Sequence, residues 1–272
     1  MNVSPELLAS LCSLAERAGA EVMAVYGTDF HATAKTDDSP LTEADLRADA
    51  VIRAGLAELC PQVPVVSEEC LPQALPADDG PFFLVDPLDG TKEFVARTGE
   101  FTVNIALVHR GEVVAGVVHA PALGETFHAA AGQGAWRRDR HGMQPIRVAR
   151  YDPAAPLRIV GSRSHGGARL AAWVDALPVK REFAPAGSSL KFCRVAEGAA
   201  DLYPRLGPTC LWDTAAAQCV LEQAGGRVTD LAGRPLRYQA CPGWLNPEFI
   251  AFSDAACLAL CAPLAPGDRA LR

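Results

Sequence analysis

The sequence predicts an α+β fold, with an antiparallel sheet in the first part of the chain and alternating helices and strands in the second. Two long amphipathic patterns near the N-terminus indicate helices, and a stretch rich in Val and Ile on both sides of Arg110-Gly111-Glu112 indicates a hairpin. Beyond residue 156, short apolar runs alternate with helical patterns. We therefore expect two halves, residues 1–152 and residues 153–272.

Two helices are expected before the first strand. In residues 5–26, Ser4 can cap the N-terminus and Pro5 suits the first helical position. The apolar face of this helix is formed by Leu7, Leu8, Leu11, Leu14, Ala15, Ala18 and Val22. The second helix is expected over residues 42–59.

Strands are expected where apolar runs rich in Val, Ile and Thr lie between turn residues. In the first half they cover 63–67, 82–86, the two arms of 101–121, and 125–130. Residues 133–156 are basic, and Pro153 and Pro156 indicate a boundary, so we interpret this stretch as a loop. In the second half, strands are expected near 157–162, 181–185, 201–205, 227 and 249, and helices at 167–177, from 188 and from 213.

The composition argues against several classes of function. The 272-residue chain has a net charge of −7, which does not favour a general nucleic-acid or anionic-membrane surface. No apolar run reaches the roughly 20 residues that span a membrane, and the N-terminus lacks a signal-peptide pattern. The nine cysteines include no C-x-x-C pair, so we expect reduced thiols and a cytoplasmic protein.

The stretch "FFLVDPLDGTKEF", residues 82–94, ends a buried strand with Asp86 and Asp89. Turn chemistry is one explanation, because Pro87 fixes φ and Gly90 tolerates a positive φ. The other explanation is that the strand directs two carboxylates at one bound cation. This stretch alone leaves both interpretations open.

Three further acidic motifs occur along the chain. They are the stretch from Asp38 to Asp45, Ser67-Glu68-Glu69, and Trp212-Asp213-Thr214-Ala215-Ala216. Each has a plain structural explanation: Thr42 with Asp45 fits a capping box, Glu68 could lie in a solvated loop, and Asp213 could cap a helix. However, most of these acids stand at the ends of strands or the start of a helix, where sites in mixed sheets are usually built.

Converging carboxylates without neighbouring Cys or His ligands suit a hard cation such as Mg²⁺, which prefers oxygen ligands. Two such ions about 3.5–4 Å apart can serve the attacking water and the leaving oxygen of a phosphoryl transfer. The six histidines form no H-E-x-x-H motif, and the chain has no G-x-x-x-x-G-K-[ST] P-loop. The pattern therefore suits a site for a hard cation and does not indicate nucleotide-driven chemistry of the P-loop kind.

The motifs "SPLTEAD", "SEE", "DPLDGTKEF" and "WDTAA" together resemble the inositol monophosphatase superfamily, whose members are Mg²⁺-dependent, lithium-sensitive phosphomonoesterases. The resemblance covers nearly the whole chain in the family's order and spacing. The stretches "DPLDGTKEFVARTGEFTVNIALV", "SRSH", "GSSLKFCRVAEG" and "LYPRLGPT" are similar to the branch of 3'(2'),5'-bisphosphate nucleotidases. The resemblance implies a layered α-β-α-β-α sandwich. It also implies hydrolysis of adenosine 3',5'-bisphosphate (PAP), a by-product of sulfate assimilation, to AMP and phosphate.

The resemblance also implies roles for individual residues. Two or three Mg²⁺ ions would be bound by the backbone carbonyl of Leu88 and the carboxylates of Glu68, Asp86, Asp89 and Asp213. Thr91, held by Asp45, would orient the nucleophilic water, and the amides of Gly90 and Thr91 would hold the phosphate. Asp45, Thr91 and Glu68 would be the catalytic residues. The other substrate-binding residues would be Gly187, Ser188, Ser189, Lys191, Arg205 and Asp213.

Two cationic residues help to predict which substrate is bound. Inositol phosphatases usually carry an acidic residue shortly before the W-D motif, where this chain has Arg205. Its planar fork suits a phosphate better than an inositol hydroxyl, unless it is simply a surface arginine on a strand. Lys191 follows a predicted helix N-terminus that could bind an anion, or it is a solvated helix lysine.

Two alternative functions stay open at this point. One is an inositol-phosphate or sugar-phosphate phosphatase on the same scaffold, because a fold does not fix a substrate. The other is a non-catalytic regulatory protein that binds metal. We expect a small phosphorylated nucleotide as the partner and no nucleic acid or integral membrane segment. A homodimer and peripheral attachment to the inner face of the cell membrane are left open.

Overall fold

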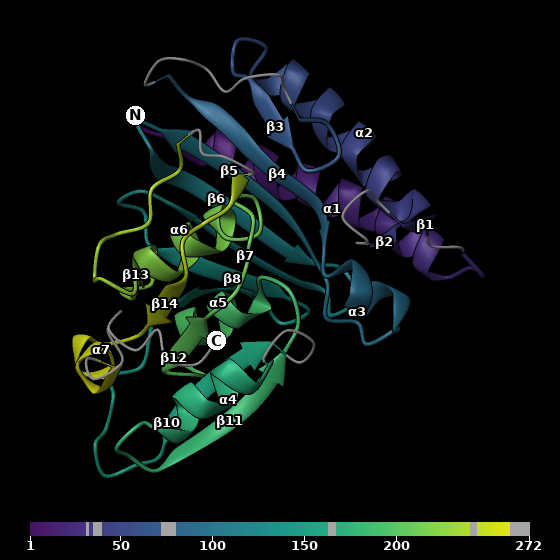
Figure 1. Ribbon diagram of the computed structural model, residues 1–272. Helices are drawn as coiled ribbons and strands as arrows, with labels where there is room; N and C mark the ends of the chain where they lie inside the picture. The colour runs from purple at the N-terminus through teal and green to yellow at the C-terminus, as the bar shows by residue number, and fades with distance from the viewer. Residues whose placement is uncertain (31–32, 35–39, 72–79, 163–166, 240–243, 262–272) are drawn as a thin grey trace.

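The computed structural model describes residues 1–30, 33–34, 40–71, 80–162, 167–239 and 244–261. Within these ranges it contains two large sheets (Figure 1). The seven-stranded sheet consists, in spatial order, of β3 (Val65–Ser67), β4 (Phe82–Asp89), β5 (Thr102–His109), β6 (Glu112–Ala120), β7 (Glu125–Ala130), β8 (Ala135–Asp139) and β9 (Gly142–Ile146). It is antiparallel except for the β3–β4 pair.

The five-stranded sheet mixes parallel and antiparallel pairs. Its spatial order is β11 (Arg181–Ala186), β10 (Leu157–Ser162), β12 (Leu202–Arg205), β14 (Phe249–Phe252) and β13 (Arg227–Asp230). Strand β10 runs parallel to both neighbours, whereas β14 runs antiparallel to both of its own. A short antiparallel pair, β1 (Thr33–Ala34) with β2 (Pro40–Leu41), stands apart from both sheets.

Helices separate and cover the two sheets. Helices α1 (Pro5–Tyr26) and α2 (Glu43–Leu59) cover one face of the seven-stranded sheet. Helices α5 (Leu190–Ala196) and α6 (Ala215–Gln223) lie between the sheets, where the largest apolar cluster is found. Helices α4 (Gly167–Asp175) and α7 (Ala255–Cys261) pack on the outer face of the five-stranded sheet. The predicted α-β-α-β-α sandwich is therefore confirmed.

The helix starts follow from the sequence as expected. Ser4 caps α1 by accepting a hydrogen bond from the amide of Leu7. Thr42 and Asp45 form a reciprocal capping box at the start of α2. The predicted hairpin is the β5–β6 pair, whose turn places Arg110 and Gly111 at positive φ. These local signals therefore predict both helix starts and the turn of the hairpin.

The interpretation of residues 133–156 as a loop was wrong for its first part. Residues 135–146 form the hairpin β8–β9 at the edge of the seven-stranded sheet. Arg137 is an acceptable strand residue here because Glu125, Asp139 and Glu197 surround its guanidinium. The predicted boundary at residues 152 and 153 falls between β9 and β10, and the division into two domains stays a prediction.

Strand β6 and helix α6 approach each other unusually closely at Gly116. A Cβ atom added at this position would lie 2.2 Å from the carbonyl oxygen of Ala216, near the start of α6. Only the absence of a side chain permits this contact. The position therefore fixes the distance between the seven-stranded sheet and the segment that begins with Asp213.

Candidate active site

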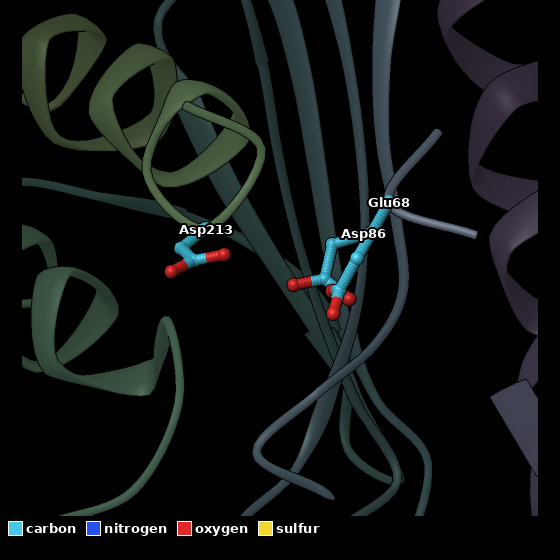
Figure 2. A group of neighbouring side chains, drawn as sticks. All are labelled: Glu68, Asp86 and Asp213. Carbon is cyan, nitrogen blue, oxygen red and sulfur yellow. The ribbon is translucent and has the colours of Figure 1, made fainter. Parts of the chain in front are cut away.

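The carboxylates of three residues from separate elements converge (Figure 2). Glu68 follows β3, Asp86 lies on β4, and Asp213 precedes α6. One oxygen from each lies within 4.8 Å of the oxygens of the other two. Asp86 is buried, and the other two are half-buried. The donor atoms are all hard oxygens, so the residues fit a hard divalent cation such as Mg²⁺.

Asp89 borders the same pocket, which has a volume of about 220 Å³. Its Oδ2 accepts hydrogen bonds from the amide of Ser189 at 2.5 Å and from the hydroxyl of Ser189 at 2.8 Å. Thr102 and Asn104 donate to the same oxygen at 3.4 Å. No described hydrogen bond reaches Oδ1, so this is the oxygen that a cation would use.

Burial and mutual repulsion raise the pKa of Asp213 well above its ordinary value, because burial penalises the charged form and Asp89 and Glu68 lie close by. Burial likewise raises the pKa of Asp89, against the opposing influence of Lys191. Carboxylates crowded in this way repel one another unless a cation lies between them. The sequence interpretation of Asp213 as a helix cap was wrong, since the cap residue of α6 is Thr214.

Asp45 connects helix α2 to the pocket through its two oxygens. Its Oδ2 accepts from the amide and the hydroxyl of Thr42 at 2.8 and 2.7 Å. Its Oδ1 lies 3.4 Å from the hydroxyl of Thr91, which also lies 3.2 Å from the carbonyl oxygen of Leu88. The capping box and the Asp45–Thr91 contact therefore coexist.

Strand β4 continues to Asp89 with a register irregularity between Asp86 and Asp89, and Gly90 then starts the short helix α3 (Thr91–Val95). The carboxylate of Asp86 accepts from the amide of Leu88 at 3.0 Å, and Gly90 has a φ of 88°. Gly90 lies close to Ser188 and Glu100, whose Cβ and carbonyl oxygen a side chain here would meet. The two carboxylates therefore stand on an irregular strand end and not in a tight turn, and the positive φ expected at Gly90 is confirmed.

Lys191 is buried, so the interpretation as a solvated helix lysine was wrong. Its side chain lines the pocket and its ammonium donates to the carbonyl of Ser188 at 2.5 Å. The same ammonium lies 5.5 Å from the ring centroid of Tyr203. Burial lowers the pKa of Lys191 to about 8, while Asp89 acts in the opposite direction. A buried cation with this environment favours a bound anion.

Arg205, at the end of β12, also lines the pocket. Its Nε donates to the hydroxyl of Thr209 at 2.5 Å, and its Nη2 donates to the carbonyl of Pro208 at 2.6 Å. Among the described contacts, none involves Nη1. Arg205 and Lys191 are close enough for the charge of Arg205 to lower the pKa of Lys191.

The pocket is lined by all the predicted site residues except Asp45, Gly187 and Ser189. Gly187 instead donates its amide to Glu100 and packs against the backbone of that residue. The hydroxyl of Ser189 lies 2.6 Å from the carbonyl of Asp213, so Ser189 joins Asp89 to the Asp213 segment. Asp38, Ser39 and residues 163–165 of the quoted motifs lie outside the described residues.

Sequence reasoning did not single out Thr209 and Tyr203 as pocket residues. It also did not single out Asn104, whose amide contacts both Asp89 and Ser189. Thr209 stands at the end of the quoted "LYPRLGPT" stretch, four residues beyond Arg205. That spacing across a turn is the one signal that could have identified it.

Comparison with known proteins gives consistent results. The chain matches the Inositol monophosphatase family over residues 4–253. It is 46% identical over 246 residues to the 3'(2'),5'-bisphosphate nucleotidase CysQ of Escherichia coli strain K12, covering 89% of this chain and 98% of that protein.

The fold of the chain is also similar to that of two solved structures. CysQ from Bacteroides thetaiotaomicron, described as a bacterial member of the inositol monophosphatase family, has a TM-score of 0.78 at 34% identity over 91% of this chain and 97% of its own. The Thermotoga maritima IMPase has a TM-score of 0.77 at 26% identity over 95% of this chain and 98% of its own.

Proposed function

The chain belongs to the inositol monophosphatase family, and on this basis we propose that it is a metal-dependent phosphomonoesterase that converts PAP to AMP and phosphate. One observation carries the proposal: a single pocket combines the carboxylates of Glu68, Asp86 and Asp213 with two cations, Lys191 and Arg205. An acidic cluster suits metal, and a basic pair suits a second phosphate. The name of the relatives at 46% identity supports the same substrate class.

Glu68, Asp86, Asp89 and Asp213 would hold two or three Mg²⁺ ions, together with the carbonyl of Leu88. When bound, such ions lower the pKa of water and offset the negative charge that develops on the transferred phosphoryl group. The chain would supply the oxygen ligands for these ions from residues on or next to β3, β4 and α6.

Thr91 and Asp45 would orient the attacking water. The hydroxyl of Thr91 has two acceptors within reach, Oδ1 of Asp45 at 3.4 Å and the carbonyl of Leu88 at 3.2 Å. Donation to Asp45 would turn a lone pair of the Thr91 oxygen toward the attacking water. The amides of Gly90 and Thr91 would donate to the phosphate that is cleaved. Water adds to phosphorus, the ester bond to the ribose oxygen breaks, and that oxygen takes up a proton.

Arg205 and Lys191 would bind the phosphate that is retained. Its burial without a cation would leave charge unpaired. A charge-assisted contact of this kind contributes about 1.5–3 kcal/mol, which corresponds to about 10- to 150-fold in binding. The cytoplasmic location expected from the sequence is part of the same proposal.

The test compares kcat/KM for PAP, inositol 1-phosphate and fructose 1,6-bisphosphate at saturating Mg²⁺. We expect a preference for PAP, and Arg205→Ala should raise KM for PAP by about 10- to 150-fold. The same variant should leave kcat/KM for inositol 1-phosphate nearly unchanged. Arg181→Ala, on the edge strand β11, is the matched control. A preference for inositol 1-phosphate would contradict the proposal.

No helix of the described residues is both long and apolar enough to cross a membrane.

A further inference from the structure

The side chain of Arg205 is held by the loop that follows it. Two of its three guanidinium nitrogens donate to this loop: Nε to Thr209 at 2.5 Å and Nη2 to the carbonyl of Pro208 at 2.6 Å. Arg205 is half-buried, and an arginine without such contacts would sample many rotamers. The contacts therefore restrict the guanidinium to one orientation before any ligand arrives.

The hydroxyl of Thr209 is oriented by a second contact. It lies 3.3 Å from the carbonyl of Gly207, to which it can donate while it accepts from Arg205. The backbone carbonyl of Thr209 accepts from the amide of Asn246 at 2.9 Å and from its side chain at 3.3 Å. Thr209 is 8% exposed, so it is held by the protein and not by solvent.

We infer that Thr209 is a positioning residue that fixes Arg205 for the phosphate retained by the substrate, and so favours substrates with two phosphate groups over those with one. The inference rests on the proposed function. In this role Thr209 acts through Arg205 and does not contact the reacting atoms. The nitrogen that no described hydrogen bond engages, Nη1 of Arg205, is the one left for a phosphate oxygen.

The physical basis is preorganisation. A side chain that is already ordered loses less conformational entropy when it binds, so affinity increases without a new contact. Lys191 makes it more important that Arg205 is held in place. Two cations in one pocket repel each other, so an arginine without these contacts would turn toward solvent. Loss of the Thr209 hydroxyl should therefore weaken binding of the retained phosphate and leave the chemical step intact.

The test uses Thr209→Val, which keeps the shape of the side chain and removes the hydroxyl. Binding of AMP and of adenosine is measured by calorimetry on the full-length chain with Mg²⁺. We expect Thr209→Val to weaken AMP binding about 5- to 10-fold and to leave adenosine binding unchanged. KM for PAP should rise by a similar factor, with kcat within about twofold of the wild type. Thr209→Ser should restore both values.

Two controls separate positioning from a general structural role. Thr229→Val removes a buried hydroxyl that has no hydrogen-bond partner among the described residues, and it should leave AMP binding unchanged. In a double-mutant cycle, Thr209→Val should have no further effect once Arg205 is alanine, because it acts through that residue.

Several outcomes would overturn the inference. They are unchanged AMP binding in Thr209→Val, an equal loss of kcat on PAP and inositol 1-phosphate, or full additivity with Arg205→Ala. Failure of the proposed function would look different: the wild-type chain itself would show no preference for PAP over inositol 1-phosphate. The calorimetric comparison of AMP with adenosine does not depend on turnover, so the two failures can be told apart.

Discussion

Asp45 shows how one side chain can satisfy two interpretations of a sequence. The pattern of Thr42 and Asp45 predicts a capping box from local rules alone, and the structure contains one. The second oxygen of Asp45 reaches Thr91, which is 46 positions further along the chain. Local rules cannot predict a contact over this separation, and it was expected only from the resemblance to a family. For Lys191 the sequence left a solvated helix lysine and an anion-binding residue both open, and the structure decides by burying it beside Ser188 and Tyr203.

Thr91→Ala should lower kcat by about 10²-fold or more, because a misaligned water loses most of the benefit of a positioned proton acceptor. KM should change far less, since the hydroxyl is expected to act on the water and not on substrate binding. Steady-state kinetics with PAP and Mg²⁺ would measure both values. Thr91→Ser should retain much of the activity, and Thr98→Ala, outside the pocket, is the control. A change in KM alone would make Thr91 a binding or turn residue.

Asp213→Asn should stabilise the metal-free protein while it abolishes activity. The pKa of Asp213 is raised in the folded state, so its ionised form costs stability that grows as the pH rises above the ordinary value of 3.8. In the presence of a chelator at pH 7.5, the variant should melt at a higher temperature than the wild type, by about 2–4 °C for each kcal/mol of repulsion that is removed. The difference should shrink as the pH falls toward 5.

Asp29→Asn, at an exposed position, should leave the melting temperature unchanged and serves as the matched control. A lower melting temperature for metal-free Asp213→Asn would show that the carboxylate supports the fold directly. In that case its hydrogen bond from the amide of Cys210 would matter more than the repulsion in the cluster.

At the scale of elements, the β8–β9 hairpin could not be predicted because its residues show no clear alternation. It lies at the sheet edge, so β9 is exposed except at Ile146 and gives no apolar face. Its partner strand carries Arg137, whose charge is matched by Glu125 and Glu197 from elsewhere in the chain. The central strands were located correctly because they are buried along nearly their whole length, although β4 runs to Asp89, beyond its expected end at residue 86.

Strand β6 carries a histidine that should make stability depend on pH. His119 is buried against Gly19 of α1, and its Nδ1 lies 3.0 Å from the hydroxyl of Thr126, which in turn contacts Glu16. Burial lowers the pKa of His119 to about 4. The unfolded chain then binds more protons between about pH 6.5 and 4, so the free energy of unfolding should fall as the pH decreases through this window.

His119→Gln should remove this part of the pH dependence, which amounts to about 2–3 kcal/mol over the window. Urea denaturation at pH 7, 5.5 and 4.5 would measure the free energy of unfolding of both proteins. His141→Gln, at an exposed position, should keep the wild-type profile. Parallel profiles for the wild type and His119→Gln would show that carboxylates alone account for the loss at acidic pH.

At the scale of the whole molecule, the carboxylate cluster joins the two halves of the chain. Glu68 directly follows β3 and Asp86 lies on β4 of the seven-stranded sheet, whereas Asp213 belongs to the half that builds the five-stranded sheet. The sandwich could be predicted because the motifs cover the chain in a fixed order. The distances within the cluster could not, since they depend on how two separately built sheets pack across α5 and α6.

Mg²⁺ should therefore raise the melting temperature of the whole protein. A ligand that binds only the folded state at 100 times its Kd adds about 2.7 kcal/mol, which is several degrees for a chain of this size. Thermal unfolding with increasing Mg²⁺ would measure the shift, and Asp213→Asn should reduce it strongly. K⁺ at matched ionic strength should not reproduce the effect. Equal shifts in both proteins would place the stabilising ion elsewhere.

The contact between Gly116 and the carbonyl of Ala216 has a consequence for how substitution libraries of this protein should be interpreted. In a library of all single replacements, position 116 should tolerate no substitution, because even the methyl group of alanine would push α6 away from the sheet. Scored by turnover alone, such a screen would rank a residue that touches no substrate beside Asp86 and Asp213. If the same variants are also scored by cellular abundance, the two kinds of position can be separated. Gly116 variants should be degraded, whereas variants of the carboxylates should stay folded but inactive.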